Sequence, residues 1–378
     1  MRILAVDVGT GTQDILLFDT DLHPENCFKL VMPSPTMMVA RRVKAATRAG
    51  RPLVLTGVIM GGGPSTWATR DHARAGHAVY ATPGAARSFD DDLDVVREKF
   101  GVTVVGEDEA VRLDGEALHL ELRDFDYGLI AGTFARYGVE LELDAVAVAV
   151  FDHGNAPPGE SDRQFRFDYL DERIRAHNRL SAFAFDAAEV PGIMTRMQAV
   201  VDSADGLEGT PLMVMDTAPA AVLGATLDPT VGGSEQVTVS NVGNFHTLAF
   251  RLGAGGIEGV FEHHTGEIDR ARLDELLGAL ADSTLRHEDV FDDQGHGALV
   301  YDPQPTPPER RVVAVTGPRR GMMHGSAHGP YFAVPYGDMM LTGCFGLVRA
   351  CADVYPQHQE VILKALGGAE RGAPWELL

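Results

Sequence analysis

Two glycine-containing turns, far apart in the chain, have the composition of phosphate-binding loops. The first combines an acid with small residues: Asp7, Gly9, Thr10, Gly11 and Thr12. The second contains Asn241, Gly243, Asn244 and Thr247. Glycine lets backbone N–H groups approach a phosphate closely, and an Asp beside phosphates usually serves their metal ion. These turns therefore predict phosphate binding, and a plain hairpin turn is the alternative for the first of them.

Histidines and carboxylates are concentrated in the second half of the chain. His246 lies in the second turn, and Glu262, His263 and His264 follow it closely. Neutral imidazole and carboxylate together suit Zn, Fe or Mn. In a strand, His263 and His264 point to opposite faces, so at most one of them can face a given site. We predict Asp7, His246 and His263 as metal ligands, and the alternative is that the histidines only hold loops through hydrogen bonds.

The apolar pattern predicts the strands and helices that must position these residues. Strands are expected over 2–6, 14–19, 52–59, 77–80, 145–151, 211–215, 236–240, 247–252, 257–261 and 311–315. Helices are expected over 35–49, 65–75, 219–225, 270–281, 338–354 and 357–366. Residues 90–137 show only short elements, and residues 157–167 look irregular. Strands that alternate with helices predict an α/β fold.

The composition excludes several classes of protein. The 378 residues include 54 acidic residues against 32 Lys and Arg, a formal net charge of −22, and this charge repels nucleic acid. The three cysteines, Cys27, Cys344 and Cys351, are too dispersed for a radical-SAM cluster and too few for a disulfide framework. No apolar run approaches the ~20 residues of a membrane helix. We expect a cytoplasmic protein that binds neither nucleic acid nor membrane, and the sequence leaves a homodimer open.

Five motifs occur in an order that resembles the actin/Hsp70/sugar-kinase superfamily. Residues 7–12 and 241–247 look like its two phosphate loops, and residues 316–320 look like its adenosine loop. The small-residue stretches 216–225 and 338–346 look like its two connecting helices, which cross tightly between the domains. Within the superfamily, the chain resembles a branch that is labelled pyruvate formate-lyase activating-like.

The resemblance implies a two-domain actin-like fold with a duplicated ribonuclease H-like core and a nucleotide cleft between domains over 1–225 and 226–378. It implies ATP as a ligand, together with a divalent metal ion such as Mg. The residues that would bind ATP are those of the two turns, joined by Thr316, Gly317 and Arg319.

The resemblance also implies a catalytic carboxylate, because kinases of the superfamily use one near the cleft to deprotonate the substrate hydroxyl. Asp216 is the first candidate and Asp152 is the second, and both follow predicted strands. A shift of one residue in the comparison would place Thr217 at the site instead of Asp216. Asp at a junction between strand and helix more commonly caps the helix or closes a turn, so that role stays open for both.

Two positions depart from the superfamily pattern. The second phosphate loop normally begins with Asp, and here it begins with Asn241, which removes a charge from the expected metal environment. We therefore expect any metal dependence to be met better by Mn, Fe or Zn than by Mg. The adenosine loop normally carries paired glycines, whereas Pro318 and Arg319 follow Gly317 here. Arg319 could bind a phosphate or carboxylate, or it could belong to a basic surface turn.

Three functions remain open from the sequence. The first is an ATP-dependent phosphotransferase or ATPase that acts on an unidentified small molecule. Gly61-Gly62-Gly63 could offer backbone donors to that molecule, or it could be a structural turn. The second is an ATPase of the actin or Hsp70 kind, whose conformational change acts on a protein partner. The third is a metal-dependent hydrolase that keeps the fold without the nucleotide. Nucleotide binding, measured with and without Mg, separates the third function from the first two.

Overall fold

The computed structural model describes residues 1–113, 115, 117–368 and 375. The end of the second predicted domain, residues 369–374 and 376–378, lies outside this description. Within the described residues, no helix is both long and apolar enough to cross a membrane. In the same part of the chain the strands form three sheets, two of six strands and one of four.

The first sheet begins with the N-terminal hairpin. Its order is β3 (Phe28–Pro33), β2 (Thr12–Asp19), β1 (Arg2–Val8), β8 (Ala145–Val150), β10 (Leu212–Asp216) and β9 (Ala184–Asp186). β1 is antiparallel to β2 and parallel to β8, and β8 is parallel to β10. Every residue of β8 is buried. Its alanines face one apolar cluster and its valines face another, so both faces of the strand are covered.

The second sheet repeats this plan. Its order is β14 (Gly297–Val300), β13 (Gly256–His264), β12 (His246–Gly253), β11 (Val237–Val242), β15 (Val313–Thr316) and β16 (Tyr331–Phe332). β11, β12 and β13 form an antiparallel meander. β15 then joins β11 in parallel, and β16 joins β15 in parallel. An antiparallel three-stranded meander followed by two parallel strands therefore occurs twice. This duplicated ribonuclease H-like order is the two-domain actin-like α/β fold, so the predicted fold class is confirmed.

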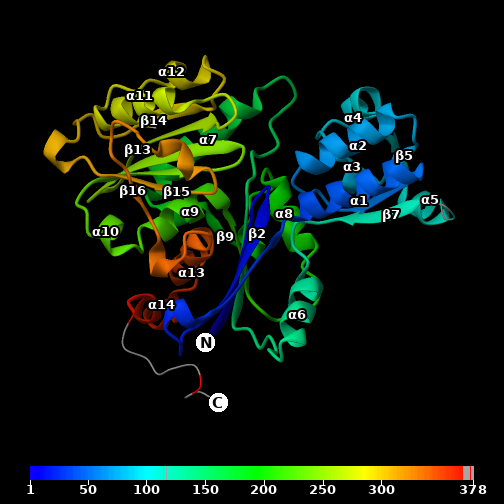
Figure 1. Cartoon of the computed structure of the whole chain (residues 1–378), viewed down its shortest axis with the longest axis horizontal. Helices are drawn as coiled ribbons and strands as arrows, with labels where there is room; N and C mark the ends of the chain where they lie inside the picture. The colour runs from blue at the N-terminus through cyan, green and yellow to red at the C-terminus, as the bar shows by residue number, and fades with distance from the viewer. Residues whose placement is uncertain (114, 116, 369–374, 376–378) are drawn as a thin grey trace.

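The third sheet is an insertion between β3 and β8. Its parallel strands are β4 (Leu53–Gly57), β5 (Val79–Ala81), β6 (Thr103–Val104) and β7 (Leu118–Leu122). Its helices are α1 (Pro35–Ala49), α2 (Pro64–Arg74), α3 (Pro83–Ala86), α4 (Leu93–Phe100) and α5 (Glu107–Arg112). In Figure 1 this insertion lies on the right, apart from the second sheet with α11 and α12 on the left.

The ends of α1 follow directly from its sequence. The Ser34 hydroxyl accepts a hydrogen bond from the backbone N–H of Met37, and Pro35 occupies the first turn, where a missing N–H costs nothing. Gly50 ends the helix in the left-handed region at φ 66°. The predicted helix over 35–49 therefore has the observed bounds.

Two short helices join the halves. α9 (Thr217–Ala225) follows β10, and α13 (Thr342–Val354) lies near the end of the chain, before α14 (Gln359–Leu366). A Cβ on Gly224 would lie 1.7 Å from the carbonyl oxygen of Thr342, and a Cβ on Gly346 would lie 1.8 Å from that of Ala220. The two helices therefore touch backbone to backbone, as the small-residue stretches predict. α13 packs on the first sheet and α9 on the second.

The remaining helices cover the sheets. They are α6 (Tyr127–Arg136), α7 (Asp162–His177), α8 (Thr195–Asp202), α10 (Pro229–Gly232), α11 (Arg270–Ala281) and α12 (His287–Phe291). α7 occupies part of the segment that the sequence predicts as irregular. Its buried residues Phe167, Leu170 and Ile174 form a narrow stripe, and the many charged residues around them hide the helical period. The predicted division of the chain at residue 225 stays a prediction.

Candidate active site

A cavity of about 320 Å³ lies between the two halves of the molecule. Both predicted phosphate loops and the predicted adenosine loop reach its wall. Ten of the residues predicted to bind nucleotide line it: Asp7, Gly9, Thr10, Gly11, Thr12, Asn241, Gly243, Asn244, Thr316 and Gly317. Two others lie elsewhere. The Thr247 hydroxyl is buried against that of Thr265 at 2.9 Å, and Arg319 is exposed at the surface.

The two phosphate loops have the same turn geometry. The N–H of Gly9 donates to the carbonyl oxygen of Thr12 at 2.9 Å, and the N–H of Gly243 donates to that of His246 at 2.9 Å. The loops also meet, because a Cβ on Gly11 would lie 3.2 Å from the Asn244 amide nitrogen. Both turns lie in the cavity wall, and turns of this kind can offer backbone N–H groups to an anion.

The third loop is held against the second. Gly317 has φ 96°, and a Cβ there would lie 2.5 Å from the side-chain oxygen of Asn241. Glycine is therefore required for both its conformation and its lack of a side chain. The backbone N–H of Arg319 donates to the carbonyl oxygen of Val242 at 2.9 Å. The segment after β15 thus positions Thr316 and Gly317 in the cavity wall while the Arg319 side chain faces solvent.

Two carboxylates form the acidic part of the cavity. Asp7 and Asp14 are direct partners across β1 and β2, and both line the cavity. Burial raises the pKa of Asp7 to about 6 although its Oδ1 accepts a hydrogen bond from Thr217 at 2.6 Å. Burial and the charge of Asp7 raise the pKa of Asp14 to about 8. Asp14 was not among the residues predicted from the sequence. A hairpin that closes at the first turn pairs residue 14 with residue 7, so its register could have predicted that the two acids lie together.

The two predicted catalytic carboxylates lie behind the cavity wall. Asp216 caps α9 by accepting from the N–H of Ala218 at 3.1 Å, and its other oxygen pairs with Arg166 at 2.8 Å. Asp152 accepts backbone hydrogen bonds from Gly154, Arg196 and Met197, each at 2.9 Å. Thr217, one residue after Asp216, lines the cavity instead. Both carboxylates thus have the capping role that the sequence left open.

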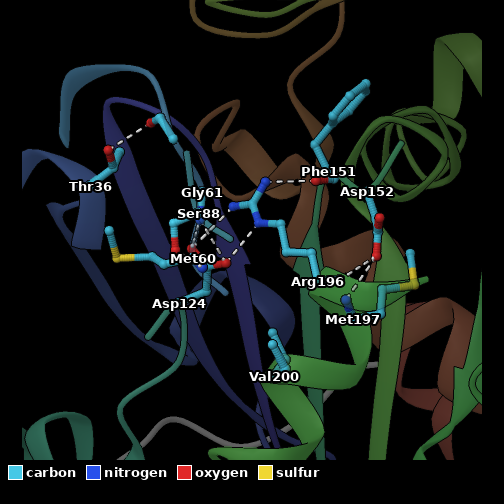
Figure 2. Close-up of polar contacts among 12 residues, drawn as sticks. Thr36, Met60, Gly61, Ser88, Asp124, Phe151, Asp152, Arg196, Met197 and Val200 are labelled. Atoms are coloured by element: carbon cyan, nitrogen blue, oxygen red, sulfur yellow. Dashed lines mark hydrogen bonds and ion pairs between the residues drawn. The ribbon is translucent and has the colours of Figure 1, made fainter. Parts of the chain in front are cut away.

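A partly buried ion pair lines the side of the cavity next to the inserted sheet. The Arg196 guanidinium faces the Asp124 carboxylate, with Nε to Oδ2 at 2.7 Å, and donates to the carbonyl oxygen of Phe151 at 2.6 Å (Figure 2). Asp124 also accepts the N–H of Gly61 at 3.1 Å. These contacts fix the first glycine of Gly61-Gly62-Gly63, and all three glycines line the cavity. The sequence gives no signal for this pair, because its partners are 72 residues apart.

Histidines form the neighbouring wall. Within the described residues, His153, His246 and His296 are a group whose ligating atoms lie within 4.8 Å of one another. Burial lowers the pKa of His153 to about 3 and that of His246 well below its ordinary value, so these rings are neutral. His263 lies outside the group because alternation along β13 turns its ring to the other face, toward Asp293 at 3.6 Å. The structure therefore brings His246 together with two histidines that the sequence did not pair with it.

A buried arginine connects the halves behind this wall. Arg166 of α7 pairs with Asp216 at 2.8 Å and with Glu262 of β13 at 2.8 Å, and all three side chains are buried. Burial would raise the pKa of Glu262, but Arg166 and His296 hold it well below its ordinary value. Glu262 therefore carries a fixed negative charge, which a buried carboxylate keeps only when it is paired.

The duplicated strand order and this cavity define an actin/Hsp70/sugar-kinase fold protein. The chain belongs to the family described as "Putative pyruvate format-lyase activating enzyme (DUF1786)", whose match covers residues 60–322. A comparison with curated proteins found no match to this chain.

Several solved structures are similar to the chain. A ROK family transcriptional regulator, homologous to the E. coli MLC protein, is 8% identical over 68% of this chain and 37% of its own, with a TM-score of 0.25. The ROK hexokinase from Thermus thermophilus is 11% identical over 68% of this chain and 48% of its own, with a TM-score of 0.22. The Aquifex aeolicus PPX-GPPA enzyme is 8% identical over 96% of this chain and 93% of its own, with a TM-score of 0.24. The chain thus spans less than half the length of the first two proteins. The fold follows from the strand order of the two six-stranded sheets.

The cysteines do not fit the iron–sulfur cluster that the family description suggests. Cys344 and Cys351 lie on α13, seven residues apart, and Cys27 directly precedes β3. All three side chains are buried, and the thiol of Cys344 donates to the carbonyl oxygen of Asp14 at 3.0 Å. A cluster needs three or four thiolates around one centre, and burial raises the pKa of both α13 thiols, which disfavours their thiolates.

Proposed function

We propose that the cavity binds ATP and that the protein transfers or hydrolyses its terminal phosphoryl group. The observation that carries this proposal is the pair of phosphate loops, which share one turn geometry and meet at Gly11 and Asn244 with Asp7 beside them. Backbone N–H groups of both loops would hold the phosphates. The third loop, at Thr316 and Gly317, would face the nucleoside.

The acidic residues fit a divalent cation. Asp14 Oδ1 is buried and has no hydrogen-bond partner among the described residues, and Asp7 lies directly opposite on the paired strand. Two adjacent carboxylates with raised pKa values are stabilised when a cation replaces the proton that would otherwise bind there. Oxygen donors of this kind suit Mg, and a bound Mg ion would neutralise charge on the phosphates. Thr217 would hold Asp7 in position through the hydrogen bond between their side chains.

The small-molecule substrate would lie on the opposite side of the cavity. Gly61-Gly62-Gly63 and the ion pair of Asp124 with Arg196 form that side. Arg196 lies near the N-terminus of α8 with its guanidinium fixed by Asp124 and the carbonyl of Phe151, so it is oriented before any ligand binds (Figure 2). Such a fixed polar wall would orient a polar substrate toward the phosphates.

Calorimetry tests the nucleotide part of this proposal. Wild-type protein is titrated with ATP and ADP, each with and without Mg, and Asp7→Asn is titrated in parallel. We expect Mg-dependent binding of both nucleotides by the wild type and loss of the Mg dependence in the variant. The matched control is Asp205→Asn, because that carboxylate is exposed. Wild-type protein that binds no nucleotide, or Asp7→Asn protein that binds Mg-ATP as tightly as the wild type, would be evidence against the proposal.

The reaction itself is tested by release of ADP over a panel of metabolites. Stimulation by one compound identifies a phosphotransferase and its substrate. A basal rate that no small molecule changes favours the conformational ATPase, whose partner is a protein.

A further inference from the structure

The histidine group is assembled from three separate segments. His153 follows β8, His246 opens β12 inside the second phosphate loop, and His296 directly precedes β14. The three ligating atoms lie within 4.8 Å of one another. Three imidazole nitrogens around one point are the donor set of a zinc site that keeps one open position. The topology thus gathers a ligand set that no single sequence motif contains.

His296 is oriented as a metal ligand would be. Its Nδ1 lies 2.9 Å from Oε1 of Glu262, and both side chains are buried. This contact is a close ion pair without hydrogen-bond geometry, and Nε2 has no hydrogen-bond partner among the described residues. A ligating histidine usually holds its second nitrogen against a carboxylate, which fixes the ring and makes the ligand more basic. A buried nitrogen with no partner costs free energy, and a bound ion would remove that cost.

The other two rings face the cavity. His246 stacks on Phe151 with ring centroids 4.1 Å apart and an angle of 7°, so the plane of its ring is fixed. His153 and His246 both line the cavity, whereas His296 is buried behind them. A metal ion among the three nitrogens would therefore have protein on one side and the cavity on the other.

We propose that His153, His246 and His296 bind one Zn(II) ion in the wall of the cavity, with Glu262 as the positioning residue for His296. Zn–N bonds of about 2.0–2.1 Å require the three ring nitrogens to move inward by roughly 1 Å or less. The fourth position is open to the cavity, where a water molecule or an oxygen atom of the substrate binds. A Zn ion bound there would lower the pKa of a coordinated water to about 7 and would so supply hydroxide at the cavity wall near neutral pH.

This site is separate from the carboxylates that fit Mg and does not depend on nucleotide binding. Asp7 and Asp14 supply only oxygen atoms, whereas the histidines supply only nitrogen atoms, and the two donor sets select different metal ions. A protein that fails to bind ATP can therefore still bind Zn here, and the two proposals fail independently.

The test measures metal binding directly, in tag-free protein without nucleotide. Apoprotein is loaded with Zn in competition with a chromophoric chelator, and with Co(II), whose visible spectrum reports tetrahedral nitrogen coordination. The variants are His153→Ala, His246→Ala and Glu262→Gln, and the matched control is His264→Ala. The His264 ring lies 4.7 Å from the His296 ring but outside the group.

We expect one Zn per chain in the wild type and in His264→Ala. Either ligand variant should weaken binding by more than tenfold and lose the tetrahedral Co(II) spectrum. Glu262→Gln should weaken Zn binding about 10–100-fold while keeping a tetrahedral spectrum. Thermal unfolding of the apo forms checks that each variant folds, and His153→Ala and His246→Ala carry the test if Glu262→Gln does not. Wild-type protein that binds no Zn, or ligand variants that bind it as tightly as His264→Ala, would overturn the proposal.

Discussion

Asp7 and Asp14 lie directly opposite each other across β1 and β2, with both carboxylates in the wall of one cavity. Two buried acids that lie next to each other do not both ionise at neutral pH. Burial raises both pKa values, and nearby acids add to the effect: Asp216 for Asp7, and Asp7 for Asp14.

Replacement of Asp14 by Asn should change how stability depends on pH. The pKa of Asp14 is about 8 in the folded protein and near 3.8 in the unfolded chain. Between about pH 4 and pH 8 the folded protein therefore binds more protons, and its free energy of unfolding falls as the pH rises. Asp14→Asn should be more stable than the wild type at about pH 8, by up to about 5 kcal/mol, and similar to it at about pH 4.

Urea unfolding in the presence of a chelator checks this pH dependence. The control is Asp205→Asn. The Asp205 carboxylate is 81% exposed, so its removal should leave the pH dependence as in the wild type. If the free energies of unfolding of Asp14→Asn and wild type differ by the same amount at every pH, Asp14 is ionised throughout.

The crossing of α9 and α13 should not tolerate a methyl group. In Gly346→Ala the new Cβ would lie 1.8 Å from the carbonyl oxygen of Ala220, so the helices must separate. We expect a loss of at least about 2 kcal/mol in the free energy of unfolding. Gly132→Ala is the matched control because Gly132 is also helical and a Cβ there meets no described atom within 4 Å. The control should gain about 0.5–1 kcal/mol, and equal effects in the two variants would contradict the close crossing.

The fold could be predicted from the sequence because its signals are local. Each half begins with apolar runs around a glycine turn, and the connecting helices are marked by small residues such as Gly224 and Gly346, whose backbones touch. α7 was missed because its buried side includes Arg166, a charged residue in the place where a helical pattern needs an apolar one. Arg166 is buried because two acids from distant strands neutralise it.

The site could be predicted only in part, for a related reason. A backbone loop is formed by contiguous residues, so a sequence motif can reveal it. Most of the predicted phosphate-binding residues accordingly line the cavity. The pair of Asp124 with Arg196 and the group of His153, His246 and His296 depend on which segments the topology brings together. Sequence spacing carries no information on such contacts, and the choice of His263 shows the limit: a strand turns neighbouring side chains to opposite faces.

Removal of Arg166 should leave two buried carboxylates without a cation. Arg166→Met keeps the length of the side chain, but Asp216 and Glu262 lose their shared partner. We expect a loss of about 3–5 kcal/mol in the free energy of unfolding at about pH 8. Because the unpaired acids would then have raised pKa values, the loss should shrink as the pH falls. Arg286→Met, which removes an exposed pair with Asp289, should have a much smaller effect and serves as the control.

Chemical denaturation at two pH values measures the effect. A loss for Arg166→Met that is the same at both pH values would show that Asp216 and Glu262 remain paired with other groups.

Ligand binding should change a contact across the mouth of the cavity. Trp67 of α2 lies edge-on to Phe245 of the second phosphate loop, with ring centroids 5.6 Å apart. The two rings belong to opposite halves of the molecule, and the glycines of α9 and α13 place a close helix crossing between those halves. If the halves rotate about this crossing when ATP binds, as in hinge closure, the distance and solvent exposure of Trp67 must change. The chain has two tryptophans, so Trp375→Phe leaves Trp67 as the single reporter.

We expect the emission of Trp67 to shift and its quenching by acrylamide to change when Mg-ATP is added to the Trp375→Phe protein. Trp67 is 49% exposed in the structure, so it can report a change in either direction. Phe245→Leu in the same background is the control, because the ring contact is lost while the phosphate loop keeps its backbone. That variant should show a smaller spectral change at equal nucleotide occupancy. Unchanged emission and quenching at a nucleotide concentration that calorimetry shows to be saturating would mean that the halves form one rigid unit, with Trp67 and Phe245 in fixed contact.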